Sequence, residues 1–219
     1  MRIPALILWS TALPAAIAGA QQPTPTQPVS AAQPSQQAPR IPRAAPSTRA
    51  TVAVLIDRRW VEGEWSNESS VAGPAKFEID WGQPHLRGRN VIGMPRVVPW
   101  DSVWRTGANM ATQLATEVDL TLGSTFIPRG IYTLFSLPTR NGWKLIVSKQ
   151  ALQWGTDYDP AQDFARIDLR SRQLSEPVES LTFWLVPAIE APTSTVFPHG
   201  VLKFAWGNTE LSTDWRVGH

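Results

Sequence analysis

The segment from Val103 to Asn109 contains the residues whose types and spacing are best suited to bind a ligand. It reads Val-Trp-Arg-Thr-Gly-Ala-Asn, so an indole, a guanidinium and two hydrogen-bonding side chains follow one another closely. Arg105 offers a planar fork of donors and Trp104 a flat apolar face, a combination that suits a sugar or a carboxylate. The same residues also suit a structural role, in which Arg105 stacks on a tryptophan and ties a loop through backbone carbonyls.

A second segment, from Gln153 to Tyr158, has the same mixture of polar and aromatic residues. Trp154 and Tyr158 would complete an aromatic platform if the two segments meet in the fold. The candidate ligand-binding residues come from these segments and from polar positions elsewhere: His85, Arg87, Trp104, Arg105, Thr106, Asn109, Trp154, Tyr158 and Asp163.

Histidines and carboxylates give a weaker argument for catalysis or metal binding. The three histidines are far apart and none has a paired metal-ligand spacing. The acidic run that begins at Asp157 does not fit an EF-hand, because its sixth position is Gln162 where glycine is required. We predict no cofactor, and a looser loop calcium site is the remaining metal hypothesis, with ligands at Asp157, Asp159 and Asp163.

Composition excludes several classes of protein. The chain has no cysteine, which rules out a disulfide framework and a thiol nucleophile. Of its 20 basic residues, Arg2, Arg40, Arg43 and Arg49 precede residue 51 and all 18 acidic residues follow it, so residues 51–219 have a net charge of −2. Such a charge would not hold nucleic acid, and none is expected as a partner. Protein partners are not predicted.

The N-terminus has the features of an export signal. Arg2 precedes an apolar stretch from Leu6 to Ile17, and Ala18-Gly19-Ala20 gives the pattern of small residues at which a signal peptidase cleaves. The apolar stretch is shorter than the ~20 residues that a membrane-spanning helix needs. We therefore predict cleavage after Ala20, no membrane span in the mature protein, and a periplasmic or extracellular location.

Residues 21–50 are rich in Gln, Pro, Ala, Ser and Thr and contain no acidic or aromatic residue. This composition buries too little apolar surface to offset the entropy of ordering, so it predicts a disordered linker. Residues 51–219 are numerous enough to form a single domain with its own core.

Alternation of apolar and polar residues predicts that this domain is all-β. In Ala75–Trp81, Phe77, Ile79 and Trp81 share one face of a strand. No segment has helical periodicity over three turns, so the predicted fold is an antiparallel β-sandwich, with a jelly roll as one form of it, and with little helix. Further strands are predicted at residues 113–122, 131–137, 143–148, 165–170, 179–186, 201–206 and 210–217.

Asn141-Gly142 lies between two predicted strands, residues 131–137 and 143–148. Both residue types tolerate positive φ angles, so the pair predicts a hairpin with a type I′ turn.

Six segments resemble, in order and spacing, the signature blocks of a bacterial exported family known as domain of unknown function 2911. They are Asp80–Arg89, Val103–Asn109, Pro128–Phe135, Gln153–Asp159, Pro177–Phe183 and Ala205–Gly207. The resemblance covers about residues 74–217, and residues 51–73 match more loosely. It implies an exported, single, β-rich domain, and it implies no particular activity, substrate or cofactor.

Three functions remain open at this point. The favoured one is a non-catalytic periplasmic or cell-surface module that binds a carbohydrate or a small polar ligand. An alternative is a hydrolase or lyase, in which Arg105 steadies a carboxylate and either His85 or an aspartate of residues 157–163 acts as acid and base. In the third, both segments only stabilise the fold and the protein is a structural scaffold.

Overall fold

The computed structural model describes residues 45–56, 59–61, 64–66, 75–189 and 196–218. The chain divides into two units, residues 1–42 and 43–219, and every described residue belongs to the second. The predicted export signal, and the linker as far as residue 44, lie outside the described residues. In the described part, no helix has the length and apolar character needed to cross a membrane.

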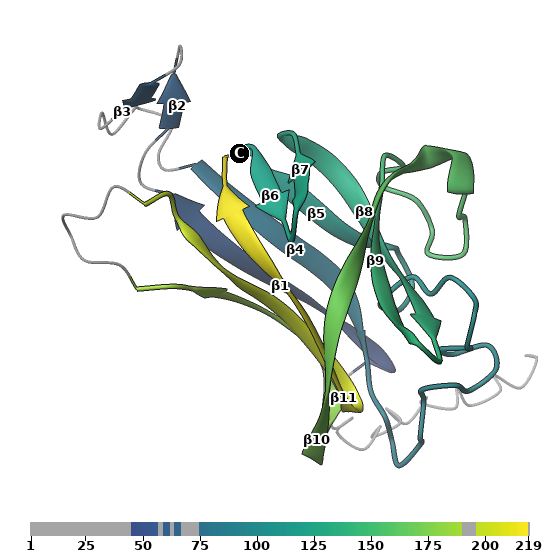
Figure 1. Cartoon of the computed structure of the whole chain (residues 1–219). Helices are drawn as coiled ribbons and strands as arrows, with labels where there is room; N and C mark the ends of the chain where they lie inside the picture. Colours follow the sequence, from purple (N-terminus) through teal and green to yellow (C-terminus); the bar gives the residue numbers. More distant parts are fainter. Residues whose placement is uncertain (1–44, 57–58, 62–63, 67–74, 190–195, 219) are drawn as a thin grey trace, which may run out of the picture. The chain divides into compact units, whose positions relative to one another are not determined.

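Nine strands of the described chain form one antiparallel sheet (Figure 1), in the order β1-β4-β5-β8-β9-β10-β11-β6-β7. A separate hairpin consists of β2 (Arg59–Val61) and β3 (Glu64–Ser66). The all-β prediction is confirmed, whereas the separate layers of a sandwich or jelly roll are not. The sheet contains β1 (Ser47–Ile56), β4 (Ala75–Pro84), β5 (Thr112–Thr116), β6 (Leu120–Leu122), β7 (Thr125–Ile127), β8 (Gly130–Thr139), β9 (Gly142–Ser148), β10 (Asp163–Pro187) and β11 (His199–Val217).

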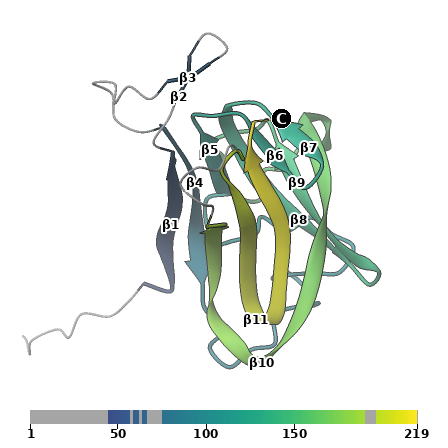
Figure 2. The ribbon, with the colours of Figure 1, turned by 60° about the vertical axis from the view of Figure 1, so that its left-hand side comes forward.

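The two long strands β10 and β11 connect the halves of the sheet. β10 pairs first with β9 and then with β11, and its register with β11 shifts between Gln173 and Thr182. Figure 2 shows both strands turning back at the bottom of the view. Gly207 has a φ of 61° at this bend, a conformation that glycine adopts without strain. The sequence predicts two shorter strands, 165–170 and 179–186, where the structure has β10, and two, 201–206 and 210–217, where it has β11. The polar residues around each bend resemble a loop.

Side chains from the two halves of the sheet pack together in the core. Phe77 of β4 meets Trp215 of β11 with ring centroids 5.0 Å apart, and Trp81 meets Phe183 of β10 at 4.9 Å. The Trp81 indole Nε1 also donates a hydrogen bond to the Leu181 carbonyl, at 2.9 Å. The predicted apolar face of residues 75–81 is therefore the buried face of β4, and this burial is the main stabilising contribution.

Several boundaries differ from the predicted ones. β1 begins at Ser47, so the last residues assigned to the linker are part of the sheet, where they pair with β4. Backbone pairing with a neighbouring strand stabilises this polar segment, and composition does not report such pairing. The predicted strand 113–122 is divided into β5 and β6, which pair with different strands.

The hairpin between β8 and β9 is confirmed, but its turn is not type I′. Thr139 pairs with Gly142, which leaves Arg140 and Asn141 as the turn residues, and neither has a positive φ. The Thr139 hydroxyl donates to the Gly142 carbonyl at 2.8 Å. Pairing continues up to Gly142, so the turn lies one residue earlier than predicted, at Arg140 and Asn141. A type I′ turn needs positive φ at both central positions, and these two residues do not have it.

Candidate functional site

The two segments with mixed polar and aromatic residues lie against each other. The Gly155 amide donates to the Asn109 carbonyl at 3.0 Å, and the Ala111 amide donates to the Gln153 carbonyl at 3.2 Å. Both segments cover the face of β8 and β9 that points away from the main core, where Phe135 and Ala111 belong to a small second cluster of buried apolar residues. The fold thus joins segments separated by more than forty positions in the sequence.

Glycines permit this close approach. A methyl group at Gly155 would lie 2.1 Å from Cδ of Arg105, so the Arg105 stem occupies the space that a side chain would need. A methyl group at Gly82 would lie 1.7 Å from the Ala108 carbonyl oxygen, and the Ala108 amide donates to the Gly82 carbonyl at 3.0 Å. The backbone of residues 105–109 is therefore held between β4 and the second segment.

Trp104 and Arg105 are neighbours in sequence but point to opposite sides of the sheet. The backbone of Trp104 exchanges two hydrogen bonds with Ser136 of β8, each 2.8 Å long, so this stretch behaves as a short strand. Alternation along a strand then directs Trp104 into the main core, where it is 6 % exposed, and Arg105 toward Gly155. The Trp104 ring is consequently not part of the ligand-accessible surface.

Arg105 is partly buried and lacks a carboxylate partner in the described part of the chain. Its Nε donates to the Gly107 carbonyl at 3.3 Å, and no described acceptor contacts its two terminal nitrogens. Burial lowers the pKa of the guanidinium below its usual value. A partly desolvated cation without a counter-ion is unfavourable, and an anion bound from outside would offset that cost.

Asn109 and Trp154 are exposed residues next to the backbone that packs on Arg105, since Trp154 precedes Gly155 and the Asn109 carbonyl accepts a hydrogen bond from the Gly155 amide. Asn109 is exposed and has a φ of 63°, a conformation that asparagine tolerates better than most residues. Trp154, which forms a bridge with Met110, is 49 % exposed. We call Arg105, Asn109 and Trp154, together with Gly155, the arginine site. It offers guanidinium donors that have no described acceptor, an exposed amide and a half-exposed indole.

Thr106 has a structural position. It is fully buried, and its hydroxyl lies 2.8 Å from the Ser136 hydroxyl. Its carbonyl accepts a hydrogen bond from the Thr112 hydroxyl at 3.0 Å. These contacts fix the backbone next to Arg105 and leave the Thr106 side chain no access to a ligand.

Tyr158, the last residue of the second segment, forms a supporting cluster with Asp163 and Arg166. The Tyr158 hydroxyl and the Arg166 Nη2 donate to Oδ2 of Asp163 at 2.8 and 2.7 Å, while Oδ1 is buried without a described partner. Burial and the hydrogen bond that Tyr158 donates to Asp163 raise the pKa of Tyr158, and the hydrogen bonds that Arg166 donates to Asp163 raise the pKa of Arg166. The Tyr158 ring packs on Phe135 at 4.9 Å, so this cluster anchors the segment to the sheet.

His85 and Arg87 lie where the end of β4 meets β10. His85 Nδ1 is 2.7 Å from the Ser180 hydroxyl, and the Arg87 side chain donates to the Pro46 carbonyl at 3.2 Å. No hydrogen bond or ion pair within the described ranges joins either residue to Arg105. The acid and base that the hydrolase or lyase hypothesis needs are therefore not brought to Arg105 by these contacts.

Two of the three aspartates of the calcium hypothesis, Asp159 and Asp163, have separate roles. Asp159 caps the short 3₁₀ helix η1 (Pro160–Gln162), and its Oδ1 accepts a hydrogen bond from the Ala161 amide at 2.9 Å. Asp163 accepts from Tyr158 and Arg166, as described above. Among the residues with described positions, no group of three or more metal-binding side chains is assembled, so the structure adds nothing to the calcium hypothesis.

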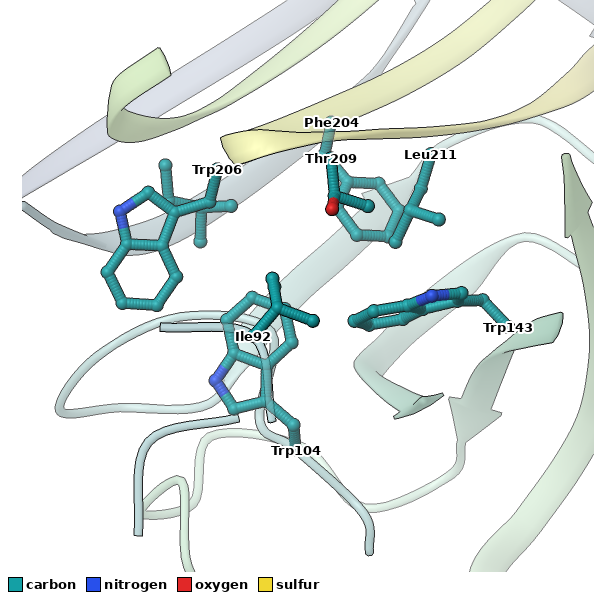
Figure 3. Close-up of a pocket in the computed structure, with 8 residues that line it drawn as sticks. Ile92, Trp104, Trp143, Phe204, Trp206, Thr209 and Leu211 are labelled. Carbon is teal, nitrogen blue, oxygen red and sulfur yellow. The ribbon is translucent and has the colours of Figure 1, made fainter. Parts of the chain in front are cut away.

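A cavity on the other side of Trp104 was not predicted from the sequence. Its walls come from the segment between β4 and β5, from Trp104 and from β9, β10 and β11 (Figure 3). The one sequence feature related to this cavity is the high number of tryptophans. The spacing of the lining residues along the chain does not indicate that they meet in the fold. We call it the tryptophan cavity, and it is lined by Ile92, Trp104, Trp143, Leu181, Phe204, Trp206, Thr209 and Leu211.

Comparison with known proteins gives one match. The model of a protein family described as "Protein of unknown function (DUF2911)" matches residues 65–214, which is more than half of the chain. This span includes all residues of the arginine site and of the tryptophan cavity, whereas β1 precedes it. No curated protein and no solved structure matches the chain significantly.

Proposed function

We propose, starting from the fact that the chain belongs to the DUF2911 family of proteins of unknown function, that it is an exported domain that binds a small carboxylate-bearing ligand without catalysis. The arginine site is the proposed binding site. The export part of the proposal comes from the N-terminal sequence, with its basic residue, short apolar stretch and small residues before position 21.

One observation carries the binding proposal, namely the unpaired state of Arg105. Its terminal nitrogens have no described acceptor, although burial already removes part of the guanidinium from water. Arginine in such a position normally has a carboxylate or several carbonyls as partners. A carboxylate from a ligand would form two parallel hydrogen bonds with the guanidinium, which is the strongest arrangement available to this side chain.

The neighbours of Arg105 favour an acidic sugar as the ligand. The exposed Trp154 indole provides a flat apolar surface on which the C–H face of a pyranose ring can stack. The exposed Asn109 amide can donate to and accept from sugar hydroxyls. A uronic acid combines a carboxylate with such a ring, so it would use all three groups of the site. Binding is preferred to catalysis because no described acid or base contacts Arg105.

Isothermal titration calorimetry with oligomers of galacturonate and glucuronate tests this proposal, with oligomers of glucose as the neutral control. We expect saturable binding of an acidic oligomer and none of the neutral one. Arg105→Lys keeps the charge but loses the paired donors, so the dissociation constant should rise about tenfold. Trp154→Ala should raise it roughly three- to tenfold. Arg170→Lys, a change at an arginine outside the site, should not affect it.

The proposal fails if no acidic sugar binds, or if Arg105→Lys binds as well as the unchanged protein. Loss of folding in both Arg105→Lys and Arg105→Met would instead support the scaffold hypothesis. The export part is tested separately by mass spectrometry of the protein purified from a bacterial host, because a mature chain should begin at Gln21. A chain that retains Met1–Ala20 would contradict it.

A further inference from the structure

Thr106 has a backbone conformation that its residue type disfavours. Its φ is 51°, in the left-handed region, where a β-branched residue is rare because its Cβ comes too close to the backbone. The next residue is Gly107, which could adopt such a φ without strain, so the left-handed turn lies one position before the residue best suited to it. Strained residues persist only where their surroundings fix them, and they are frequent at ligand-binding sites.

Hydrogen bonds fix Thr106 in this conformation. Its buried hydroxyl lies 2.8 Å from the Ser136 hydroxyl, and its carbonyl accepts from the Thr112 hydroxyl at 3.0 Å. The backbone is bonded to β8 at Trp104 and to β4 at Ala108. Since β5 lies between these two strands and begins at Thr112, the chain passes over the start of β5 at Thr106.

This turn determines which nitrogens of Arg105 a ligand can reach. The Arg105 Nε donates to the Gly107 carbonyl at 3.3 Å, and this hydrogen bond spans Thr106. The direction of that carbonyl relative to Arg105 therefore depends on the Thr106 backbone. With Nε bonded, a carboxylate has the two terminal nitrogens, for which the described residues provide no acceptor. It would approach the guanidinium end-on and accept one hydrogen bond from each of them.

From this geometry we infer that Thr106 is a positioning residue of the arginine site. Its left-handed turn, fixed by its hydroxyl, holds the Arg105 Nε on the Gly107 carbonyl and leaves the two terminal nitrogens for the ligand. Thr106 does not touch the ligand, because it is fully buried. An arginine that is already held in place loses less freedom on binding, which increases affinity. The inference rests on the proposed function, since it concerns how that carboxylate is bound.

Three variants of Thr106 test the inference by calorimetry with the acidic sugar oligomers. Thr106→Ser keeps the hydroxyl, so the dissociation constant should stay within about twofold. Thr106→Val keeps the shape but loses the hydroxyl, so nothing holds a β-branched residue at positive φ, and the dissociation constant should rise about tenfold. Thr106→Gly lacks the hydroxyl but tolerates the conformation, so its affinity should lie between those of the other two.

A matched control separates positioning from stability. Thr116 is also buried, and its hydroxyl donates to the Val118 carbonyl at the other end of β5. Thr116→Val should lower stability without changing the affinity. The inference is wrong if Thr106→Val binds as the unchanged protein does, if Thr106→Ser or Thr106→Gly binds no better than Thr106→Val, or if Thr116→Val weakens binding equally. It is also wrong if circular dichroism shows Thr106→Val to be unfolded, because the turn would then serve the fold.

Hydrogen exchange of the Arg105 Nε–H group, followed by NMR on the full chain without ligand, gives an independent measurement. Exchange should be slow in the unchanged protein and in Thr106→Ser, and faster in Thr106→Val, because the bond to the Gly107 carbonyl is lost. Equal exchange in all three proteins would overturn the inference. If no acidic sugar binds to any of them, the proposed function fails, while this measurement still decides whether Thr106 positions Arg105.

Discussion

Trp104 of the tryptophan cavity and Arg105 of the arginine site are adjacent in sequence. The two regions nevertheless differ in burial, in polarity and in the interactions that hold them. The arginine site lies on two surface segments that are held by backbone hydrogen bonds and by glycines. The tryptophan cavity lies inside the sheet and is held by packing of large side chains. One region has a cation for which the described residues provide no counter-ion, and the other has a small space lined by large apolar side chains.

From this difference we expect the proposed ligand binding and the stability of the fold to depend on different residues. Substitutions in the cavity walls act on the free energy of unfolding, because these side chains belong to the main core. Substitutions in the arginine site should act mainly on ligand affinity, because its side chains contribute little buried apolar area. The following predictions test that division, beginning with the largest expected effect.

The same change at two tryptophans should give the clearest contrast. Trp206→Ala removes a ring that is 3 % exposed and stacked on Trp104, so we expect a loss of about 3–5 kcal/mol in the free energy of unfolding. Trp154→Ala removes a ring that is half exposed and should cost less than about 1 kcal/mol. Urea denaturation followed by circular dichroism measures both values. Equal losses of unfolding free energy would contradict the expected difference between the cavity walls and the arginine site.

A methyl group at Gly155 should displace the Arg105 side chain and so disrupt the arginine site. Gly155→Ala forces Arg105 away from its present position, with an expected cost of about 1–3 kcal/mol and loss of ligand binding. Gly130→Ala is the matched control, since its methyl group would lie no closer than 3.3 Å to Tyr132 and should have a much smaller effect. Calorimetry and denaturation should be applied to both variants. Full affinity in Gly155→Ala would show that Arg105 is not held in place by this contact.

Arg105 should contribute little to stability. Arg105→Met keeps much of the apolar stem and removes a partly desolvated charge, so the free energy of unfolding should stay the same or rise by up to about 1 kcal/mol. The scaffold hypothesis predicts a decrease instead, because the Nε bond to the Gly107 carbonyl would be lost. Thermal unfolding of the purified variant decides between these outcomes.

The smallest effect on the free energy of unfolding is expected for an exposed ion pair outside both regions. Its arginine, Arg170, serves as a comparison for Arg105. Arg170 donates two hydrogen bonds of 2.7 Å to Asp214, and these bonds lower the pKa of the carboxyl group while they raise that of Arg170. A lowered pKa in the folded state favours folding above the ordinary carboxyl pKa, and this contribution is lost as the pH falls through the lowered value. Because both side chains are exposed, it should be less than about 1 kcal/mol.

Titration of Asp214 by NMR measures this effect. The carboxyl pKa should be below its ordinary value in the unchanged protein and should return toward it in Arg170→Met. No change between the two proteins would show that the pair is not formed in solution. Either result provides a reference for Arg105, the pKa of which is lowered by burial, whereas the pKa of Arg170 is raised by its hydrogen bonds to Asp214.

The sequence allowed much of the fold to be predicted, because alternation in β4 and the apolar runs of β8 and β9 are local patterns. It could not show that β10 and β11 are continuous through their bends, since polar residues there resemble a loop until their pairing partners are known. It also could not show that β1 begins before residue 51, because pairing with β4 stabilises that segment more than its own composition does.

For the candidate site, the sequence by itself determined the residue types, the absence of cysteine, the family and the two segments that carry indole and guanidinium groups. Only the tertiary structure decided that Trp104 is an interior wall while Trp154 is exposed, and that Arg105 has no described counter-ion. The reason is that burial and charge pairing depend on residues distant in sequence, such as Gly155 and Trp206. Residue spacing within one segment contains no information about which distant residues will surround it.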